Sequence, residues 1–587
     1  MAGGRWVGVA RRQRGQVVGL TLVLAIPVVV ALVALHSPRW FPLIDMAQIE
    51  MRVRDVPTTH PPLVGLGGRM QGYDQTGSHP GPLGFYLLWP VYRLLGSSAW
   101  ALQVSSATLS LAAAGLAVWI ARRRTGTTFA VVVAAGLAPL LRGYGAVMVT
   151  EPWNPRLPVV WWVVFLLAVW SVLDRDVRML PLVVLAGTVC MQTHIPYAVL
   201  VGGLWALTVA AVAHQARRDR EARRWAIGSG VLLVALWLPP LYEQLTHHPG
   251  NLAIIVENFR HPYDDQVPFG DAVDTWLQHL DVTALVRGDV LRHGSPAGGI
   301  AFLAVWAAAA AWAWRRREST LLSLHVVAGA ATVLGLLAIS RIFGPLWPYL
   351  VFWAWGTTAV ALVAIVWTFV TPWPRPVLAG ATAVLVVTTA AFTVEAPDTE
   401  MAAAGRSDEL SVLAGPTVER LEDDPVGCGD DCTYLVTWID PVELESVGHG
   451  LLLELERQGF DARAAYDEDL AVRPHRTARR SQVDAEVQIV SGDAVITELQ
   501  VRDHAELVAV VDPRTPGERT EYRRLRRALL ADLEAHDRHG LALRVAEQVI
   551  VETDPRMTAG ARSLAWYANR FPRPSAVFLI TPEEPRP

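Results

Sequence analysis

The sequence contains no lysine, so all 51 of its basic residues are arginines. We attribute this absence to a coding bias rather than to a function. Charge is scarce as well, since charged residues form 18% of the chain and the formal net charge is −4. So small a net charge gives no electrostatic basis for binding nucleic acid, and that class of partner is excluded.

Cysteine is also rare, with three in the chain. Cys428 and Cys432 stand in the run Cys-Gly-Asp-Asp-Cys, and in an oxidising compartment they could form a tight disulfide. The alternative is a pair of free thiols, whereas a zinc site would need two further ligands that this run lacks. Cys190 lies in an apolar block, where we expect it to serve in packing.

Long apolar runs, by contrast, are abundant, and hydrophobic residues form 52% of the chain. The longest runs, such as 17–35 and 104–120, are almost free of charge and approach the ~20 residues that span a bilayer. Tryptophans cluster at the ends of such runs, as in an interfacial aromatic belt. No clean Ala-x-Ala site follows the first run, which favours a membrane helix over a cleaved signal peptide.

Arginine clusters follow every second apolar run, and in short loops such clusters stay on the cytoplasmic side. We therefore predict an α-helical polytopic protein of the cell (plasma) membrane, with a cytoplasmic N-terminus and about eleven spans. Their ranges are 17–35, 99–120, 128–148, 157–173, 179–194, 197–213, 225–243, 299–314, 320–340, 346–370 and 376–394.

This topology predicts a membrane domain (1–395) with outer loops 36–98 and 244–298, followed by an extracytoplasmic domain (396–587). In the second domain charge rises and the apolar runs shorten to strand length. Strands are expected at 433–439, 485–490, 507–511 and 576–580, and helices at 442–458 and 518–536. Their alternation predicts a soluble α/β domain.

The first outer loop begins with an acidic, helix-like stretch. Helical spacing gathers Ile44 and Ile49 on one face and turns Asp45 and Glu50 away from it. This pattern indicates an amphipathic helix that lies on the membrane surface. Asp45 stands at the start of this helix, where a carboxylate can act simply as a cap.

The same loop ends in a proline-rich motif, Ser78-His79-Pro80-Gly81-Pro82, which predicts a helix start. The helix that follows is apolar but interrupted by Pro90 and Arg93, so we expect it to be re-entrant or interfacial. His79 is expected to cap the start of this helix.

This layout resembles the GT-C glycosyltransferases, such as the protein O-mannosyltransferases and the aminoarabinose transferase of lipid A. In that superfamily an acidic residue follows the first span, here Asp45, and a His-Pro-Pro-Leu-like motif opens an interfacial helix. A second span then ends in cytoplasmic arginines, here Arg122–Arg124, and a further acidic residue, here Glu151, lies in the next outer loop. The chain departs from the pattern at Gly81 in the motif and at Glu151, which replaces the usual Asp beside Asn154.

The resemblance implies transfer of a sugar from a polyprenyl-phosphate donor to a cell-envelope glycan, lipid or protein acceptor on the outer face of the membrane. Asp45 would then be the general base that deprotonates the acceptor hydroxyl. An arginine would hold the departing lipid phosphate with paired hydrogen bonds. Arg341, at the outer end of a span, and Arg69 are the candidates, although Arg341 could instead snorkel to the interface.

Four further residues, Glu151, Asn154, His79 and His194, are expected to line the site or contact the acceptor. Glu151 could orient the acceptor or bind a divalent cation, and a structural ion pair with Arg156 is the alternative. His194 ends a span on the outer side, where the superfamily often places a polar residue facing the site. No cofactor is certain.

Two other functions remain as alternatives. A lipid or polysaccharide transporter or flippase often shows repeated halves and ionisable residues near mid-membrane, and the sequence shows neither. A non-catalytic membrane assembly protein is compatible with the departures at Gly81 and Glu151. Convergence of the candidate residues on one outer cavity would favour the enzyme.

Overall fold

The protein divides into two compact units in a computed structural model. Unit 1 comprises Met1–Pro38 and Arg52–Met401, and unit 2 comprises Arg39–Met51 and Ala402–Pro587. Unit 2 begins close to the expected boundary at 396, but it also takes in a short piece of the first outer loop. The structure describes residues 2–288, 294–370, 374–423, 428, 432–440, 446–541 and 556–581.

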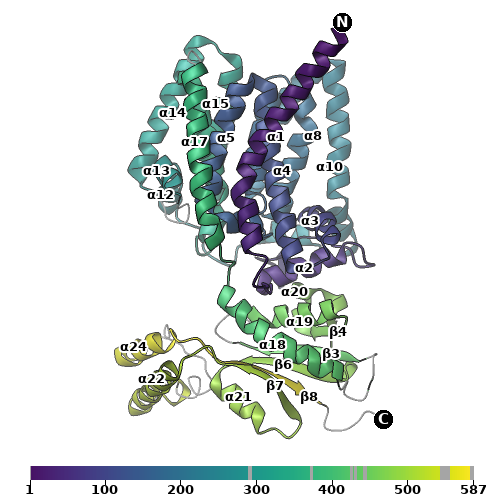
Figure 1. Ribbon diagram of the computed structural model, residues 1–587, viewed down its shortest axis with the longest axis vertical. Helices are drawn as coiled ribbons and strands as arrows, with labels where there is room; N and C mark the ends of the chain where they lie inside the picture. Colours follow the sequence, from purple (N-terminus) through teal and green to yellow (C-terminus); the bar gives the residue numbers. More distant parts are fainter. Residues whose placement is uncertain are drawn as a thin grey trace. The chain divides into compact units, whose positions relative to one another are not determined.

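Unit 1 is a bundle of long apolar helices that run alongside one another (Figure 1). Within the described residues, nine helical segments are long and apolar enough to cross a membrane. They are α1 (Ala2–Ala34), α4 (Ala99–Thr125), α5 (Thr127–Tyr144), α9 (Tyr197–Ala216), α10 (Arg220–Thr246), α14 (Pro296–Arg316), α15 (Ser319–Ile339), η2 with α16 (Pro348–Val351, Trp353–Val370) and α17 (Pro374–Glu395). The chain is a multi-pass membrane protein.

Two shorter apolar helices, α7 (Val159–Leu173) and α8 (Leu180–Thr193, preceded by η1, Val177–Met179), coincide with two further expected spans. Residues 159–172 of α7 are all buried, including Trp162 and Trp170. A helix that is apolar on every side is stable only when neighbours cover it, and α4, α8, α9, α15 and α16 do so. The span count of eleven stays a prediction.

Between its long helices unit 1 carries short elements, among them a hairpin that the sequence did not predict. Strands β1 (Gly67–Gly72) and β2 (Gln75–Ser78) pair antiparallel, and both turn residues, Tyr73 and Asp74, have positive φ, as a type I′ turn requires. Asn251 fixes this hairpin, since its side chain accepts from Ser78 N at 2.7 Å and donates to Ser78 O at 3.0 Å. The helices here are α3 (Leu83–Leu94), α6 (Ala146–Thr150), α11 (Asn251–Arg260), α12 (Phe269–His279), α13 (Val282–Arg287) and η3 (Ala396–Asp398).

Unit 2 contains a mixed six-stranded sheet in the order β5-β4-β3-β6-β8-β7. Strands β3 (Thr433–Ile439), β4 (Asp461–Ala465), β5 (Thr477–Ala478) and β6 (Ala485–Ser491) pair in parallel, while β8 (Ser575–Ile580) is antiparallel to β6 and to β7 (Ala505–Val511). All four expected strands are present, and the predicted α/β character of this domain is confirmed.

Helices cover both faces of this sheet (Figure 1). Along β8, Val577 and Leu579 face a core shared with α18 (Ala404–Asp423) and α19 (Ser446–Gln458), whereas Ala576 and Phe578 pack against α21 (Asp493–Gln500). Successive side chains of a strand point to opposite faces of the sheet, and here both faces of β8 are buried. Residues 442–445 of the helix expected at 442–458 lie outside the described residues. The remaining helices are α20 (Asp469–Val472), α22 (Pro516–Ala535), α24 (Ala559–Ala568) and three short 3₁₀ turns, η5 (Tyr466–Glu468), η6 (Pro474–Arg476) and η7 (Arg480–Gln482).

The cysteine pair closes a small loop in unit 2. Cys428 and Cys432 form a disulfide with their Cα atoms 5.2 Å apart, and Cys432 lies in the core next to β3. Cys190 is a buried free thiol in α8, as expected of a packing residue.

Candidate active site

His79 directly follows strand β2 and is fixed by hydrogen bonds on its backbone and its ring. Its backbone pairs with Gly65 and Leu66, and its Nδ1 accepts a hydrogen bond from Ile195 N at 3.3 Å. Because Nδ1 accepts, the ring proton stands on Nε2. Burial lowers the pKa of His79 to about 4, so the ring is neutral at pH 7.

His79 does not cap the helix that follows, and that prediction was wrong. Helix α3 begins at Leu83, its N-cap is Pro82, and no side chain of the N-cap bonds the helix. Gln192, at the end of α8, supplies the capping hydrogen bond instead, because its Oε1 accepts from Leu83 N at 3.2 Å. A partner more than one hundred residues away satisfies the helix start, which a local pattern cannot reveal.

Gly81, the departure within the motif, has a steric reason. Its N donates to Gln192 O, and a Cβ at this position would stand 2.4 Å from Oε1 of Gln192. Gln192 cannot easily move, because its amide also donates to Leu236 O at 2.9 Å. The motif is therefore fitted closely against the end of α8.

Gly81→Ala should destabilise unit 1 by roughly 1–3 kcal/mol, because overpacking would displace Gln192 from its two hydrogen bonds. The measurement is thermal unfolding of the purified protein in detergent. Gly202→Ala is the matched control, since Gly202 lies in α9 with open space around it. Equal melting temperatures for the two variants would show that the motif does not pack against Gln192 as described.

His194 lies beside His79 at the C-terminal end of α8. The two ring centroids are 5.3 Å apart, and His194 is 2% exposed. Its Nδ1 is buried and finds no hydrogen-bond partner among the described residues. A second ring contact, at 6.5 Å, joins His194 to Tyr349 of η2.

Tyr349 connects several candidate residues that are distant in sequence. The guanidinium of Arg69, on β1, stands 6.0 Å from the Tyr349 ring centroid, and the Trp153 ring meets the same ring at a tilt, with centroids 5.1 Å apart. Arginine over an aromatic face is an attractive pairing. Neither aromatic residue was predicted as part of the site. Trp153 stands close to Glu151 and Arg156 in the sequence, which was the available signal, whereas Tyr349 lies within the expected span 346–370.

Glu151 ends α6 and forms an ion pair with Arg156, whose guanidinium lies over Trp153 at 5.3 Å. The carboxylate is buried, with 1% of the residue exposed. The ion pair, one of the alternatives for Glu151, is thus present. No group of three or more His, Cys, Asp or Glu side chains within the described ranges is arranged to hold a metal ion.

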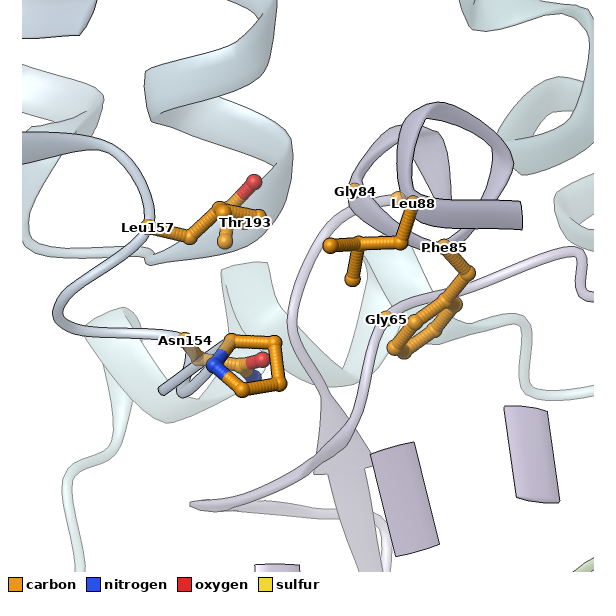
Figure 2. Close-up of a pocket in the computed structure, with 9 residues that line it drawn as sticks. Gly65, Gly84, Phe85, Leu88, Asn154, Leu157 and Thr193 are labelled. Atoms are coloured by element: carbon orange, nitrogen blue, oxygen red, sulfur yellow. The ribbon is translucent and has the colours of Figure 1, made fainter. Parts of the chain in front are cut away.

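A narrow cavity opens beside these residues (Figure 2). Leu157 and Thr193 line one side of it, Leu88 and Phe85 of α3 line the other, and Asn154 lies below them in this view. It has about 10 Å³ of room for a water-sized group. Thr193 Oγ1 is buried there without a hydrogen-bond partner among the described residues. The cavity therefore offers a polar atom to a small ligand group.

Arg341 follows α15 on the segment that leads to η2 and Tyr349, but its side chain is exposed. This segment is tied down by a hydrogen bond from Val267 N to Ile342 O and by one from Gln266 to Ser340 O. No contact between described side chains joins Arg341 to Tyr349, Glu151 or His194. A phosphate-binding role for Arg341 stays a prediction.

Asp45 lies in the first turn of α2 (Ile44–Asp55) and belongs to unit 2. The expected helix is present, but its polar side is not exposed, since Glu50 is 0% and Arg52 4% exposed. Both charges have ionic partners, Arg457 for Glu50 and Asp55 for Arg52. Asp45 itself is partly exposed.

Comparison with known proteins gives a fold and no close relative. No protein-family model and no curated protein matches the chain. ArnT from Cupriavidus metallidurans in the apo state is similar, with a TM-score of 0.50 and 14% identity over 87% of this chain and 97% of that chain. ArnT bound to undecaprenyl phosphate gives a TM-score of 0.51 and 14% identity over 83% and 95% of the two chains.

The chain has the GT-C fold. The resemblance that the sequence indicated is thereby confirmed at the level of fold. Within unit 1, this fold gathers His79, His194, Arg69, Glu151 and residues of the Asn154 cavity into a connected group. Ring contacts run from His79 through His194 to Tyr349. Arg69 and Trp153 both contact the Tyr349 ring, and Arg156 lies over Trp153.

Proposed function

We propose that this chain is a membrane glycosyltransferase that transfers a sugar from a polyprenyl-phosphate donor to an acceptor on the outer face of the membrane. The observation that carries the proposal is the shared fold with ArnT, which has been solved bound to undecaprenyl phosphate. The connected group of aromatic, histidine and arginine side chains in unit 1 supports it. Sugars stack on aromatic faces, and phosphates pair with guanidinium groups.

The donor phosphate is assigned to arginine. Arg69 is exposed and lies over Tyr349, and it forms no ion pair with a described residue, so its guanidinium can receive a phosphate. Arg341 is exposed as well, on the segment that leads to Tyr349. Arg156 is a poorer candidate, because Glu151 already neutralises it. Two arginines would hold the leaving lipid phosphate as its charge grows.

The acceptor is activated by Asp45. The carboxylate takes the proton of the acceptor hydroxyl, the acceptor oxygen bonds to the anomeric carbon, and the bond from that carbon to the phosphate oxygen breaks. The products are the glycosylated acceptor, polyprenyl phosphate and protonated Asp45, which returns its proton to solvent. His79 and His194 offer hydrogen bonds to the sugar, and Asn154 and Thr193 bind one small polar group of donor or acceptor.

The orientation follows from charge and redox chemistry. Arginine clusters favour a cytoplasmic N-terminus in the plasma membrane. The Cys428–Cys432 disulfide supports an extracytoplasmic place for the C-terminal domain, since disulfides persist in oxidising compartments. The donor, the surrounding lipid and a cell-envelope acceptor would then meet on the outer side.

The test is transfer of label in membranes. Membranes that carry the protein are incubated with radiolabelled polyprenyl-phosphate sugars, and membranes without it serve as the control. We expect label to leave the lipid fraction and enter a glycan, lipid or protein fraction only where the protein is present. Label that stays on the donor with every sugar offered would count against the proposal.

Thr193→Val should lower kcat/KM for transfer about tenfold, the value of one hydrogen bond, while leaving stability within about 1 kcal/mol. Valine has the shape of threonine and removes a hydroxyl that has no partner among the described residues. Thr208→Val in α9 is the control, since that buried hydroxyl donates to Leu204 O and lies outside the cavity. A stability loss with unchanged transfer would show that the Thr193 hydroxyl serves packing alone.

A further inference from the structure

Unit 2 incorporates a short segment of the chain from outside its own sequence range. Residues 39–51 are separated from the rest of unit 2 by residues 52–401 of unit 1, yet they belong to the core of unit 2. Phe41, Leu43, Ala47 and Met51 are each no more than 7% exposed and pack in one cluster with α18 and α19. Burial of four apolar side chains from one short segment fixes it firmly on the unit.

Two ion pairs reinforce this packing on the side of α19. Arg457 donates to Glu50 through both Nε, at 2.8 Å, and Nη2, and their side chains are 7% and 0% exposed. Arg39 donates to Glu454 at 2.6 Å. A doubly hydrogen-bonded arginine–carboxylate pair sets both the distance and the angle between its partners.

The backbone of the segment is held as well. Phe41 N donates to Ser407 Oγ of α18 at 2.7 Å, and Arg476 donates to Met51 O at 3.4 Å. The segment is thus tied to unit 2 at its beginning and at its end. Asp45 lies between these two anchors, four residues beyond Phe41 and six before Met51.

We propose that unit 2 is a positioning domain, which holds residues 39–51 and thereby sets where the Asp45 carboxylate stands. This inference rests on the proposed function, in which Asp45 takes the proton of the acceptor. Arg457 and Glu50 are positioning residues in this account and need not touch a substrate. The C-terminal domain would thus contribute to catalysis by positioning Asp45, a role that its sequence alone does not suggest.

The expected consequence follows from the geometry of proton transfer. A general base must stand within hydrogen-bond reach of the proton that it removes. A displacement of about 1 Å can cost roughly 100-fold in rate, while donor binding is unaffected. Loosening residues 39–51 should therefore lower kcat and leave the KM for the donor nearly unchanged.

The experiment compares Arg457→Gln, Arg457→Lys and the milder Arg39→Gln with the wild-type chain. Arg502→Gln is the matched control, because Arg502 forms an exposed ion pair with Glu498 on the opposite face of the sheet. Two quantities are measured: release of polyprenyl phosphate, as kcat and KM, and deuterium uptake by residues 39–51. The second measurement needs no activity.

For Arg457→Gln we expect kcat to fall about 100-fold, KM to stay within about twofold, and deuterium uptake to rise in residues 39–51. Arg457→Lys should recover part of the rate, Arg39→Gln should lose a few-fold, and Arg502→Gln should match the wild type. If Arg457→Gln unfolds unit 2 as a whole, the kcat and deuterium uptake of Arg39→Gln test the proposal instead. Arg39 is half-exposed, so its loss should disturb the fold only mildly.

Faster exchange of residues 39–51 with an unchanged kcat would overturn the proposal, and so would unchanged exchange in both Arg457→Gln and Arg39→Gln. A different outcome is that the wild-type chain itself releases no polyprenyl phosphate. That result contradicts the proposed function, and with it the catalytic purpose of unit 2, whatever the exchange shows.

Discussion

Asp45→Asn should lower kcat for sugar transfer by roughly 100- to 10,000-fold and leave the fold intact. Asparagine has the shape of aspartate but no carboxylate, so it cannot take the acceptor proton. Asparagine also caps a helix as well as aspartate does, and the residue is partly exposed in the first turn of α2, so stability should change little. The measurement is release of polyprenyl phosphate by the purified variant, with thermal unfolding recorded on the same sample.

Asp74→Asn is the matched control for this variant. Asp74 lies at the exposed tip of the β1–β2 hairpin, where asparagine tolerates the positive φ equally well. It should transfer sugar at the wild-type rate. Wild-type activity in Asp45→Asn would show that another group is the base.

Arg156→Leu should cost about 3–5 kcal/mol of stability, because it leaves the Glu151 carboxylate buried without its cation. Arg142→Leu provides the comparison. Arg142 pairs with Glu395 through both Nε and Nη2, but the side chains are 26% and 50% exposed, so its loss should cost at most about 1 kcal/mol. Thermal unfolding in detergent measures both.

The double variant Glu151→Leu with Arg156→Leu separates a structural from a catalytic role. Removing both charges should restore most of the stability that the single variant loses. If transfer returns as well, the pair is structural, and if stability returns without transfer, Glu151 acts on the acceptor. Equal melting temperatures for Arg156→Leu and Arg142→Leu would contradict the burial of this pair.

The regular parts of the fold followed from the sequence, because their signals are local. Apolar runs of span length became the long helices of unit 1, and the run Thr433–Ile439 became β3 with the expected bounds. Helix α22 likewise follows the apolar spacing over 518–536. In each case the length of the apolar run and its period determine the element.

The parts that escaped prediction depend on distant partners. The hairpin of β1 and β2 has two non-glycine residues with positive φ at its turn, and Asn251 stabilises it from the start of α11. The polar residues of α2 were expected to face solvent, but Glu50 meets Arg457 more than four hundred residues later. Spacing along the chain carries no information about such pairs.

The candidate site was predicted unevenly for the same reason. His79, His194, Arg69 and Glu151 stand out in sequence because they are polar residues next to spans, and unit 1 brings them into one connected group. Tyr349 and Thr193 were missed, since an aromatic residue or a threonine at a helix end is common in membrane proteins. Only their contacts, the Arg69–Tyr349 pairing and the unpartnered hydroxyl of Thr193, single them out.

The most direct test of the account asks whether the sugar–phosphate bond is broken. The purified protein is reconstituted into vesicles with a polyprenyl-phosphate sugar labelled separately in its sugar and in its lipid, and a cell-envelope extract is added as acceptor. The account predicts that the two labels separate, with glycosylated acceptor and free polyprenyl phosphate formed in equal amounts. Passage of the doubly labelled donor across the bilayer with its bond intact, and no polyprenyl phosphate released, would contradict it and identify a transporter.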